Sequence, residues 1–300
     1  MSNLFTLDFF INAISLGSLY ALIALGLVIV YGILKLVNFA YGELIMIGGY
    51  TLYVLTGATP LPWLTIAILA VVVAMITSNL TELAAFRPVR AKSLTAMLIT
   101  SFAVSTLLQN AALLIISPRA RAVPLPPIFS EGLSLLGTEI PMRNILTIVT
   151  SLALLGALNL LLKHTILGIA LRAAAENFKM TRVLGVPADL VISVAFAISG
   201  ILAGVVSIFW IGRTASVTPT IGGAPLLIGF VATVIGGMRS LTGAVVGGYL
   251  YGIIFSLIGV LLPQSLLDYR EAFMFLVVII ILLFRPEGLI KGGSTGERVG

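Results

Sequence analysis

Long stretches without a charged side chain are the feature that most constrains this sequence. A helix needs about 20 apolar residues to cross a bilayer. Only 9% of the chain is charged and its mean hydropathy is +1.18, so the solvent for most of it must be lipid. The sequence therefore predicts an all-α fold, a polytopic bundle of transmembrane helices. The runs free of Asp, Glu, Lys and Arg are 9–34, 44–81, 93–118, 144–162, 190–212, 214–238, 240–267 and the shorter 272–284.

Prolines and glycines divide two of these runs. Pro60 and Pro62 interrupt the second run, because proline removes a backbone donor and restricts the residue before it. We expect helices over roughly 39–57 and 61–86. The start of 214–238 is rich in proline and glycine, which indicates a loop followed by a short helix. About eight to nine spans result.

The basic residues orient the bundle. If successive loops alternate sides, twelve Lys and Arg fall on one side and five on the other. The richer side should be cytoplasmic, which puts the N-terminus outside and the C-terminus inside. A loop at about 118–143 would then be external and one at about 163–187 cytoplasmic. We treat 1–300 as a single transmembrane domain.

Composition excludes several classes of protein. The chain has no cysteine and one histidine, His164, so thiolate chemistry and His-rich metal sites are excluded and no metal ligands are assigned. The net charge of +6 comes from short loops between apolar runs and does not indicate nucleic acid as a partner. No Gly-x-x-x-x-Gly-Lys-[Ser/Thr] phosphate loop is present, so we expect no ATP hydrolysis by this chain and no bound cofactor. We assign no catalytic residue and expect a protein that is not an enzyme.

The predicted cytoplasmic loop contains a helix of its own. Residues 169–182 are good helix formers, and Gly185 with Pro187 is a stop signal. Arg172, Glu176 and Lys179 would share one face at helical spacing. A short helix with small, apolar and charged residues suits docking into a groove on a partner. The alternative is a solvated linker.

A solute path needs polar groups inside the bundle, and ionisable groups there are functional suspects. The expected spans put Asn38 and Glu43 near an interface, and they leave Glu82 close enough to Arg87 for an ion pair. Paired glycines at small-xxx-small spacing, such as Gly200 and Gly204, suit either static packing or helices that rock against each other. The polar candidates are Asn38, Glu43, Glu82, Gln109, Asn110 and Asn159.

Five segments, taken in order, resemble the LivH-type permease of branched-chain amino acid ABC importers, and the similarity covers nearly the whole chain. The family usually has His where this chain has Tyr41, and the coupling segment at 172–185 is a loose variant of the Glu-Ala-Ala…Gly pattern. The segments are Gly17-Ser18-Leu19-Tyr20-Ala21-Leu22 through Asn38-Phe39-Ala40-Tyr41-Gly42-Glu43 to Gly48-Gly49-Tyr50, Arg87-Pro88-Val89-Arg90 with Ser105-Thr106-Leu107-Leu108-Gln109-Asn110, Arg172-Ala173-Ala174-Ala175-Glu176-Asn177 with Leu184-Gly185-Val186, Gly236-Gly237-Met238-Arg239-Ser240, and Phe284-Arg285-Pro286-Glu287-Gly288-Leu289.

The resemblance implies a larger machine in a bacterial inner membrane. It implies a second, LivM-type permease, two ATP-binding subunits that use the ATP, and a periplasmic binding protein that delivers a small-molecule solute. Similar permeases carry leucine-type amino acids, their amides, urea and other small solutes. The resemblance also implies contact with the ATP-binding subunits through Arg172, Ala174, Ala175, Glu176, Asn177 and Gly185.

A secondary transporter driven by an ion gradient is the main competing interpretation. It would need carboxylates or histidines at mid-membrane. Glu43 and Glu82 are poorly placed for this in the expected spans. A channel is favoured less, because a filter in the Gly-rich region 222–248 would leave the cytoplasmic helix without a purpose. An intramembrane enzyme is also favoured less, because no nucleophile with its base is evident.

Overall fold

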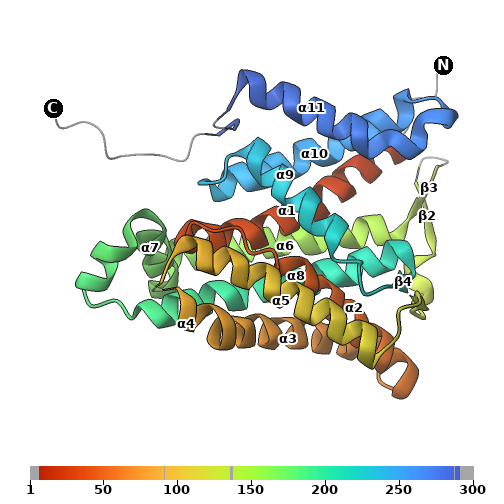
Figure 1. The fold of residues 1–300 in the computed structure, drawn as a ribbon. Coiled ribbons are helices and arrows are strands. Elements are labelled where there is room, and N and C mark those ends of the chain that lie inside the picture. The colour runs from red at the N-terminus through yellow and green to blue at the C-terminus, as the bar shows by residue number, and fades with distance from the viewer. Residues whose placement is uncertain (1–6, 91, 136–137, 287, 291–300) are drawn as a thin grey trace.

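A computed structural model of the chain describes residues 7–90, 92–135, 138–286 and 288–290. The helices lie side by side in a bundle, with the short strands at one end and α7 at the other (Figure 1). The chain ends, whose sides the charge pattern predicts, lie outside the described residues. The elements are α1 (Leu7–Leu34), α2 (Tyr41–Ala58), α3 (Trp63–Thr81), the π-helix η1 (Glu82–Phe86), α4 (Arg87–Val89), α5 (Leu94–Ile115), β1 (Arg121–Ala122), the 3₁₀ helix η2 (Pro127–Phe129), β2 (Gly132–Leu135), β3 (Thr138–Pro141), α6 (Met142–His164), α7 (Ile166–Val183), α8 (Ala188–Thr214), β4 (Ser216–Val217), α9 (Gly223–Gly236), α10 (Leu241–Leu261), the 3₁₀ helix η3 (Gln264–Tyr269) and α11 (Arg270–Phe284).

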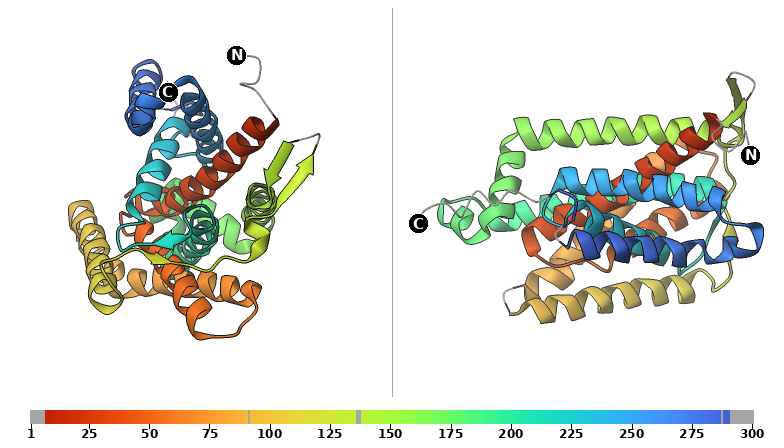
Figure 2. Two further views of the ribbon diagram at one scale, coloured as in Figure 1. Left: turned by 90° about the vertical axis from the view of Figure 1, so that its right-hand side faces the viewer. Right: turned by 90° about the horizontal axis from the view of Figure 1, so that it is seen from above.

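Helix α1 is the centre of the bundle. It is apolar all round, as buried helices are, and 89% of its most apolar 18-residue window is buried. It packs against α6, α8, α9 and α10, which surround it in two further views (Figure 2). In α5 and α6 the buried share of the window is only 17% and 22%. Side chains such as Leu107 and Leu160 point outward there, as expected for helices that face lipid or another subunit.

The nearly all-α bundle that the sequence predicts is confirmed. Within the described residues, six helical segments are long and apolar enough to cross a membrane: α1, the continuous segment Trp63–Val89, α5, α6, Asp189–Thr214 of α8, and α10. The break at Pro60 and Pro62 is confirmed, since α2 ends at Ala58 and α3 begins at Trp63. The loop followed by a short helix is also confirmed, as α9 has 14 residues.

The 118–143 region departs from a purely helical fold. Strands β2 and β3 form an antiparallel hairpin, and β1 pairs with β4, which directly follows α8. Hydropathy gave no signal for these strands, because each is only two to four residues long. The pairing of β1 with β4 ties the loop before α6 to the end of α8.

Glycines set the closest helix contacts. A Cβ on Gly204 would lie 2.6 Å from the Val71 Cα, and one on Gly200 would lie 2.7 Å from the Met75 Cα, so α8 and α3 touch backbone to backbone. A Cβ on Gly252 would lie even closer, 2.4 Å from the Gly17 Cα, where α10 crosses α1. These distances support the packing interpretation of the small-xxx-small pairs.

Candidate solute and coupling sites

The first candidate site is the turn between α1 and α2, comprising residues 38–43 and called the elbow below. After α1 the chain turns back into the bundle before α2 begins (Figure 1). The Ser105 hydroxyl donates a hydrogen bond of 3.0 Å to Oε1 of Glu43. Ser105 lies near the middle of the 22-residue helix α5. The Tyr41 ring packs directly on Gly26 inside α1. The elbow therefore lies well inside the bundle.

Helix α9 begins at the same place. The backbones of Gly42 and Gly222 are in direct contact, so close that a Cβ on either residue would clash with the other's carbonyl. From this point α2 runs toward the end of the bundle that carries the strands, and α9 runs toward the end that carries α7 (Figure 1). Two helix N-termini thus meet inside the bundle, an arrangement that transporters use around buried ligands.

Polar groups of the elbow are buried and only partly satisfied. The Asn38 Oδ1 accepts the Ala40 N–H at 3.1 Å, which closes the turn before α2. Asn38 and Glu43 are 2% and 4% exposed. The Asn38 Nδ2, the Glu43 Oε2 and the Tyr41 hydroxyl are buried without a hydrogen-bond partner among the described residues. Such groups cost free energy unless something else binds them.

The expected position of Asn38 and Glu43 near an interface is wrong. Counting from the end of α1 places them at one end of the bundle, whereas the chain folds back and carries them inward. Two contacts hold it there, the Glu43–Ser105 hydrogen bond and the stacked rings of Phe39 and Phe102, whose centroids are 4.2 Å apart. Glu43 is therefore buried inside the bundle, where an ionisable group can act on a solute or an ion.

The other polar candidates lie apart from the elbow. Gln109 is half-buried and Asn110 is exposed on α5, one turn beyond Ser105. The Asn110 Nδ2 donates to the Thr106 carbonyl of its own helix at 2.7 Å. Asn159 is exposed on α6. Gln109 follows Ser105 by four residues on α5 and so lies on the same helix face.

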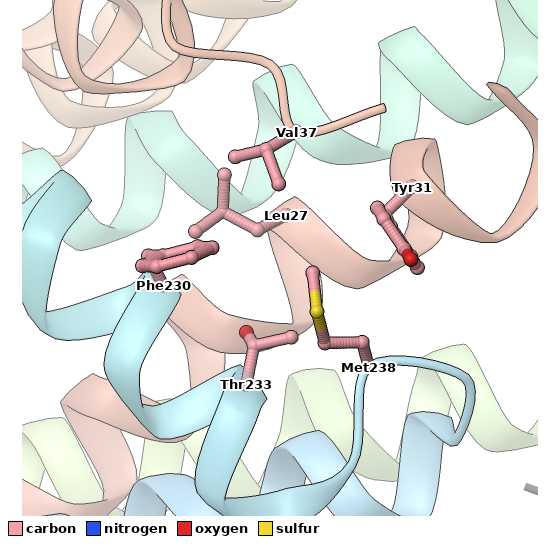
Figure 3. A pocket seen from close by; sticks show the side chains of 6 residues that line it. All are labelled: Leu27, Tyr31, Val37, Phe230, Thr233 and Met238. Carbon is pink, nitrogen blue, oxygen red and sulfur yellow. The ribbon is translucent and has the colours of Figure 1, made fainter. Parts of the chain in front are cut away.

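A small apolar hollow lies next to the elbow, between α1, the chain before α2, and α9. Its volume is about 10 Å³, close to the room that one water molecule needs. Leu27, Val37, Phe230 and Met238 line it with Tyr31 and Thr233 (Figure 3). An amino acid does not fit there, so in this conformation the hollow is closed to a solute.

The second candidate site is a network of charges where η1 meets the start of α8. Asp189 accepts hydrogen bonds from both Arg87 and Arg90. Glu82 is 1% exposed, accepts a 2.9 Å hydrogen bond from Ser193, and lies 3.7 Å from Arg90. The expected pair of Glu82 with Arg87 is therefore wrong. Residues 82–86 form a π-helix, which rotates Glu82 toward α8.

Helix α7 carries the residues expected to contact ATP-binding subunits. Arg172, Glu176, Asn177 and Gly185 are exposed, whereas Ala174 is 2% exposed and packs into the bundle. Ala175 is half-buried, and its carbonyl accepts a 2.8 Å hydrogen bond from the Nζ of Lys35. Partial burial and the nearby Arg239 lower the pKa of Lys35. The end of α1 is thus tied to α7.

The predicted helix is present, but it is not continuous. Asn177 has φ −147° and ψ 92°, which breaks α7. Its side chain accepts the Met180 N–H at 3.0 Å and so caps a new turn. Arg172 and Glu176 precede the break and are both exposed. The expected face that they share with Lys179 cannot be followed past Asn177, because the side chain of Lys179 lies outside the described residues. The predicted stop is present, and Gly185 has φ +86°, which favours glycine.

Six apolar helices and a buried polar elbow define a multi-pass helical membrane protein of the transporter type. The profile of the family described as "Branched-chain amino acid transport system / permease component" matches residues 9–282. This chain is 34% identical to the high-affinity branched-chain amino acid transport system permease protein BraD of Pseudomonas aeruginosa, over 93% of this chain and 94% of the relative.

Two further relatives agree. The permease protein LivH of Escherichia coli is 34% identical over 96% of each chain, and a probable LivH of Methanocaldococcus jannaschii is 31% identical over 93% of this chain and 90% of the relative. The chain belongs to the branched-chain amino acid permease family. No solved structure matches it significantly.

Proposed function

We propose that this chain is the membrane-spanning subunit of an ATP-driven importer that moves branched-chain amino acids, or a similar small polar solute, by alternating access. The observation that carries the proposal is the match of almost the whole chain to permeases whose names state this transport. A central helix surrounded by glycine-lined contacts suits a bundle with two packings.

Other subunits complete the machine. A LivM-type permease pairs with this chain, two ATP-binding subunits hydrolyse ATP, and a periplasmic binding protein delivers the solute. This chain binds no cofactor. The weakly buried faces of α5 and α6 are available to the second permease or to lipid.

The chain lies in the inner (plasma) membrane with about eight to nine membrane segments. The six long helices are joined by α2, α9 and α11, which have 18, 14 and 15 residues. The N-terminus is outside and the C-terminus is cytoplasmic. The whole of 1–300 acts as one transmembrane domain, with the hairpin end outside and α7 in the cytoplasm.

Helix α7 couples the bundle to the ATP-binding subunits. The exposed Arg172, Glu176, Asn177 and Gly185 contact the partner, while Ala174 and Ala175 hold the helix against the bundle. The route into the membrane is short, because Asp189 follows α7 by six residues and binds Arg87 and Arg90. A pull on α7 therefore moves α8 and η1 together.

The solute passes the elbow. Asn38 and Glu43 contribute polar groups from the elbow, and Gln109 and Asn110 contribute them from α5. Intramembrane polar groups with unsatisfied atoms are the usual partners of a polar solute. In this proposal, α5 moves relative to α2 during the cycle.

One observation favours a second candidate, the transporter driven by an ion gradient. Glu43 lies inside the bundle, where such a protein would hold a proton or cation. The family assignment argues against this candidate, since the named relatives belong to transport systems with separate permease components.

Purification with partners tests the proposal. A tagged chain, extracted in mild detergent from its native host, should bring down a second permease and two ATP-binding proteins in stoichiometric amounts. In proteoliposomes the complex should take up leucine only with ATP and the binding protein. A chain that purifies alone and transports without ATP would contradict the proposal.

A further inference from the structure

Glu43 stands out among the buried carboxylates because, unlike Glu82, it has no Lys or Arg within ion-pair distance among the described residues. Ser105 donates to Oε1, but Oε2 is buried without a partner. Across the described part of the chain, the ion pairs to carboxylates are formed by Arg87 and Arg90, and both arginines bind Glu82 or Asp189. No Lys or Arg among the described residues therefore balances a charge on Glu43.

A buried carboxylate of this kind favours a cationic donor. Removing a charge from water is costly unless the charge is paired and hydrogen-bonded. In its ionised form the free Oε2 accepts hydrogen bonds, and the partner that stabilises this form is a positively charged group with N–H donors. A primary ammonium has this chemistry, and it can bind one carboxylate oxygen while Ser105 keeps the other.

The rest of the elbow offers hydrogen-bond donors that suit a negatively charged group. The Asn38 Nδ2 is a buried donor without a partner. The N-termini of α2 and α9 meet beside it, and helix N-termini attract negative charge. The stacked rings of Phe39 and Phe102 add an apolar wall. An acceptor for a cation thus lies within a few residues of donors for an anion.

We infer that the elbow binds the zwitterionic head of an amino acid, with Glu43 Oε2 accepting from its ammonium group and Asn38 Nδ2 donating to its carboxylate. The inference rests on the proposed function and names the group that the permease recognises. Binding requires the elbow to open. Helix α5 covers the elbow and would move away from it, because α5 is the least buried of the six spans and contacts the elbow through Phe102 and Ser105.

The test uses the purified, assembled transporter and two probes with the same carbon chain. The first is 3-methylbutylamine, which has an ammonium group and no carboxylate, and the second is 4-methylpentanoate, which has the reverse. A ligand that binds the folded state raises the thermal midpoint. We expect the amine to raise the midpoint of the wild type. In Glu43→Gln the apparent affinity for the amine should fall at least about tenfold, as for the loss of a charge-assisted hydrogen bond.

Three further variants keep the result interpretable. Glu82→Gln removes a buried carboxylate that already has partners, so its midpoint should be lower at the start but should rise with the amine as in the wild type. Glu43→Asp keeps the charge if Glu43→Gln fails to fold, and it should retain a weaker response. Asn38→Ala should leave the response to the amine and lose the response to 4-methylpentanoate.

Two results would overturn the inference. One is an equal response to the amine in the wild type and in Glu43→Gln. The other is a midpoint that rises with sodium over choline in the wild type only, without any response to the amine, which would assign Glu43 to an alkali cation. If the wild type responds to the amine but shows no ATP-driven leucine uptake, the proposed function fails and the binding site stands.

Discussion

Two buried glutamates of this protein have the same first partner and opposite surroundings. Glu43 at the elbow and Glu82 at the start of η1 each accept a hydrogen bond from a serine of a neighbouring helix. Glu82 also has Arg90 at 3.7 Å and belongs to a network that includes Asp189. Each glutamate also has one oxygen without a hydrogen-bond partner among the described residues, Oε2 in Glu43 and Oε1 in Glu82. The difference is the cation: Glu82 has Arg90 beside it, and Glu43 has no Lys or Arg within ion-pair distance among the described residues.

The difference suits the Glu82 network and the elbow to different steps of the proposed transport cycle. The network around Glu82 joins the start of α8, just after α7, to the segment before α5. In the proposed function this network transmits the movement of α7. The elbow around Glu43 is built where two helix N-termini meet inside the bundle, and in the proposal it receives the ligand. A carboxylate that is already paired is weak evidence of a binding site, whereas an unpaired one is strong evidence.

The largest expected effect is on coupling. Glu176 is exposed on α7, so Glu176→Lys should leave the thermal midpoint and the response to 3-methylbutylamine unchanged. Placing like charges across an interface costs several kcal/mol, so ATP-driven uptake should fall at least about thirtyfold. The matched control is Glu139→Lys, the same reversal at an exposed residue of β3, which should leave uptake intact. Normal uptake by Glu176→Lys would remove α7 from the coupling role.

The two glutamates should respond differently to the same isosteric change. Glu82→Gln leaves Arg90 with less compensation, so we expect a loss of about 2–3 kcal/mol in the free energy of unfolding. Glu43→Gln removes a charge without a cation partner, so the change should be less than about 1 kcal/mol and can be stabilising. Thermal unfolding of the two complexes in the same detergent measures both. Equal losses would mean that the two environments do not differ in the way described.

Asp189 gives a smaller effect that depends on salt. Its side chain is 50% exposed, so solvent screens its pairs with Arg87 and Arg90. Asp189→Asn should cost roughly 1 kcal/mol at low ionic strength and less in concentrated salt. Thermal midpoints at two salt concentrations test this. A loss that salt does not reduce would show that Asp189 acts through something other than its charge.

The smallest effect should come from the serine that holds the elbow. Ser105→Ala removes one hydrogen bond from Glu43, worth about 0.5–1.5 kcal/mol. The charge of Glu43 stays, so the response to the amine should persist. Ser193→Ala is the parallel change at Glu82 and should cost a similar amount. A much larger loss in Ser105→Ala would mean that this bond, and not the aromatic stack, holds α5 on the elbow.

The sequence predicted the helical bundle well because hydropathy and proline placement report directly on spans. Pro60 and Pro62 located the break between α2 and α3, and the glycine-rich stretch before α9 indicated its short length. The helix formers at 169–182 and the stop at Gly185 and Pro187 indicated the helix between α6 and α8, whose coupling role stays a prediction. These features are local, so they can be read from a few neighbouring residues.

The elbow could not be predicted in the same way. Hydropathy shows which residues prefer lipid, but it does not show that the chain after α1 folds back inside the bundle. That depth depends on contacts between distant residues, such as Glu43 with Ser105 and Gly42 with Gly222. Asn38 is a local signal for a turn, because its side chain accepts the Ala40 N–H. It does not indicate how deep in the bundle the turn lies. The break at Asn177 has no glycine or proline to mark it, because the asparagine caps a new turn with its own side chain.

The most direct test of the account is leucine uptake by the reconstituted transporter with and without ATP. Proteoliposomes should contain this chain, its partner permease and the ATP-binding subunits, with the binding protein outside. The account predicts uptake that requires ATP and the binding protein and that survives when the ion gradient is collapsed. Uptake that persists after ATP depletion and stops when the ion gradient is collapsed would contradict the account and assign Glu43 to ion coupling.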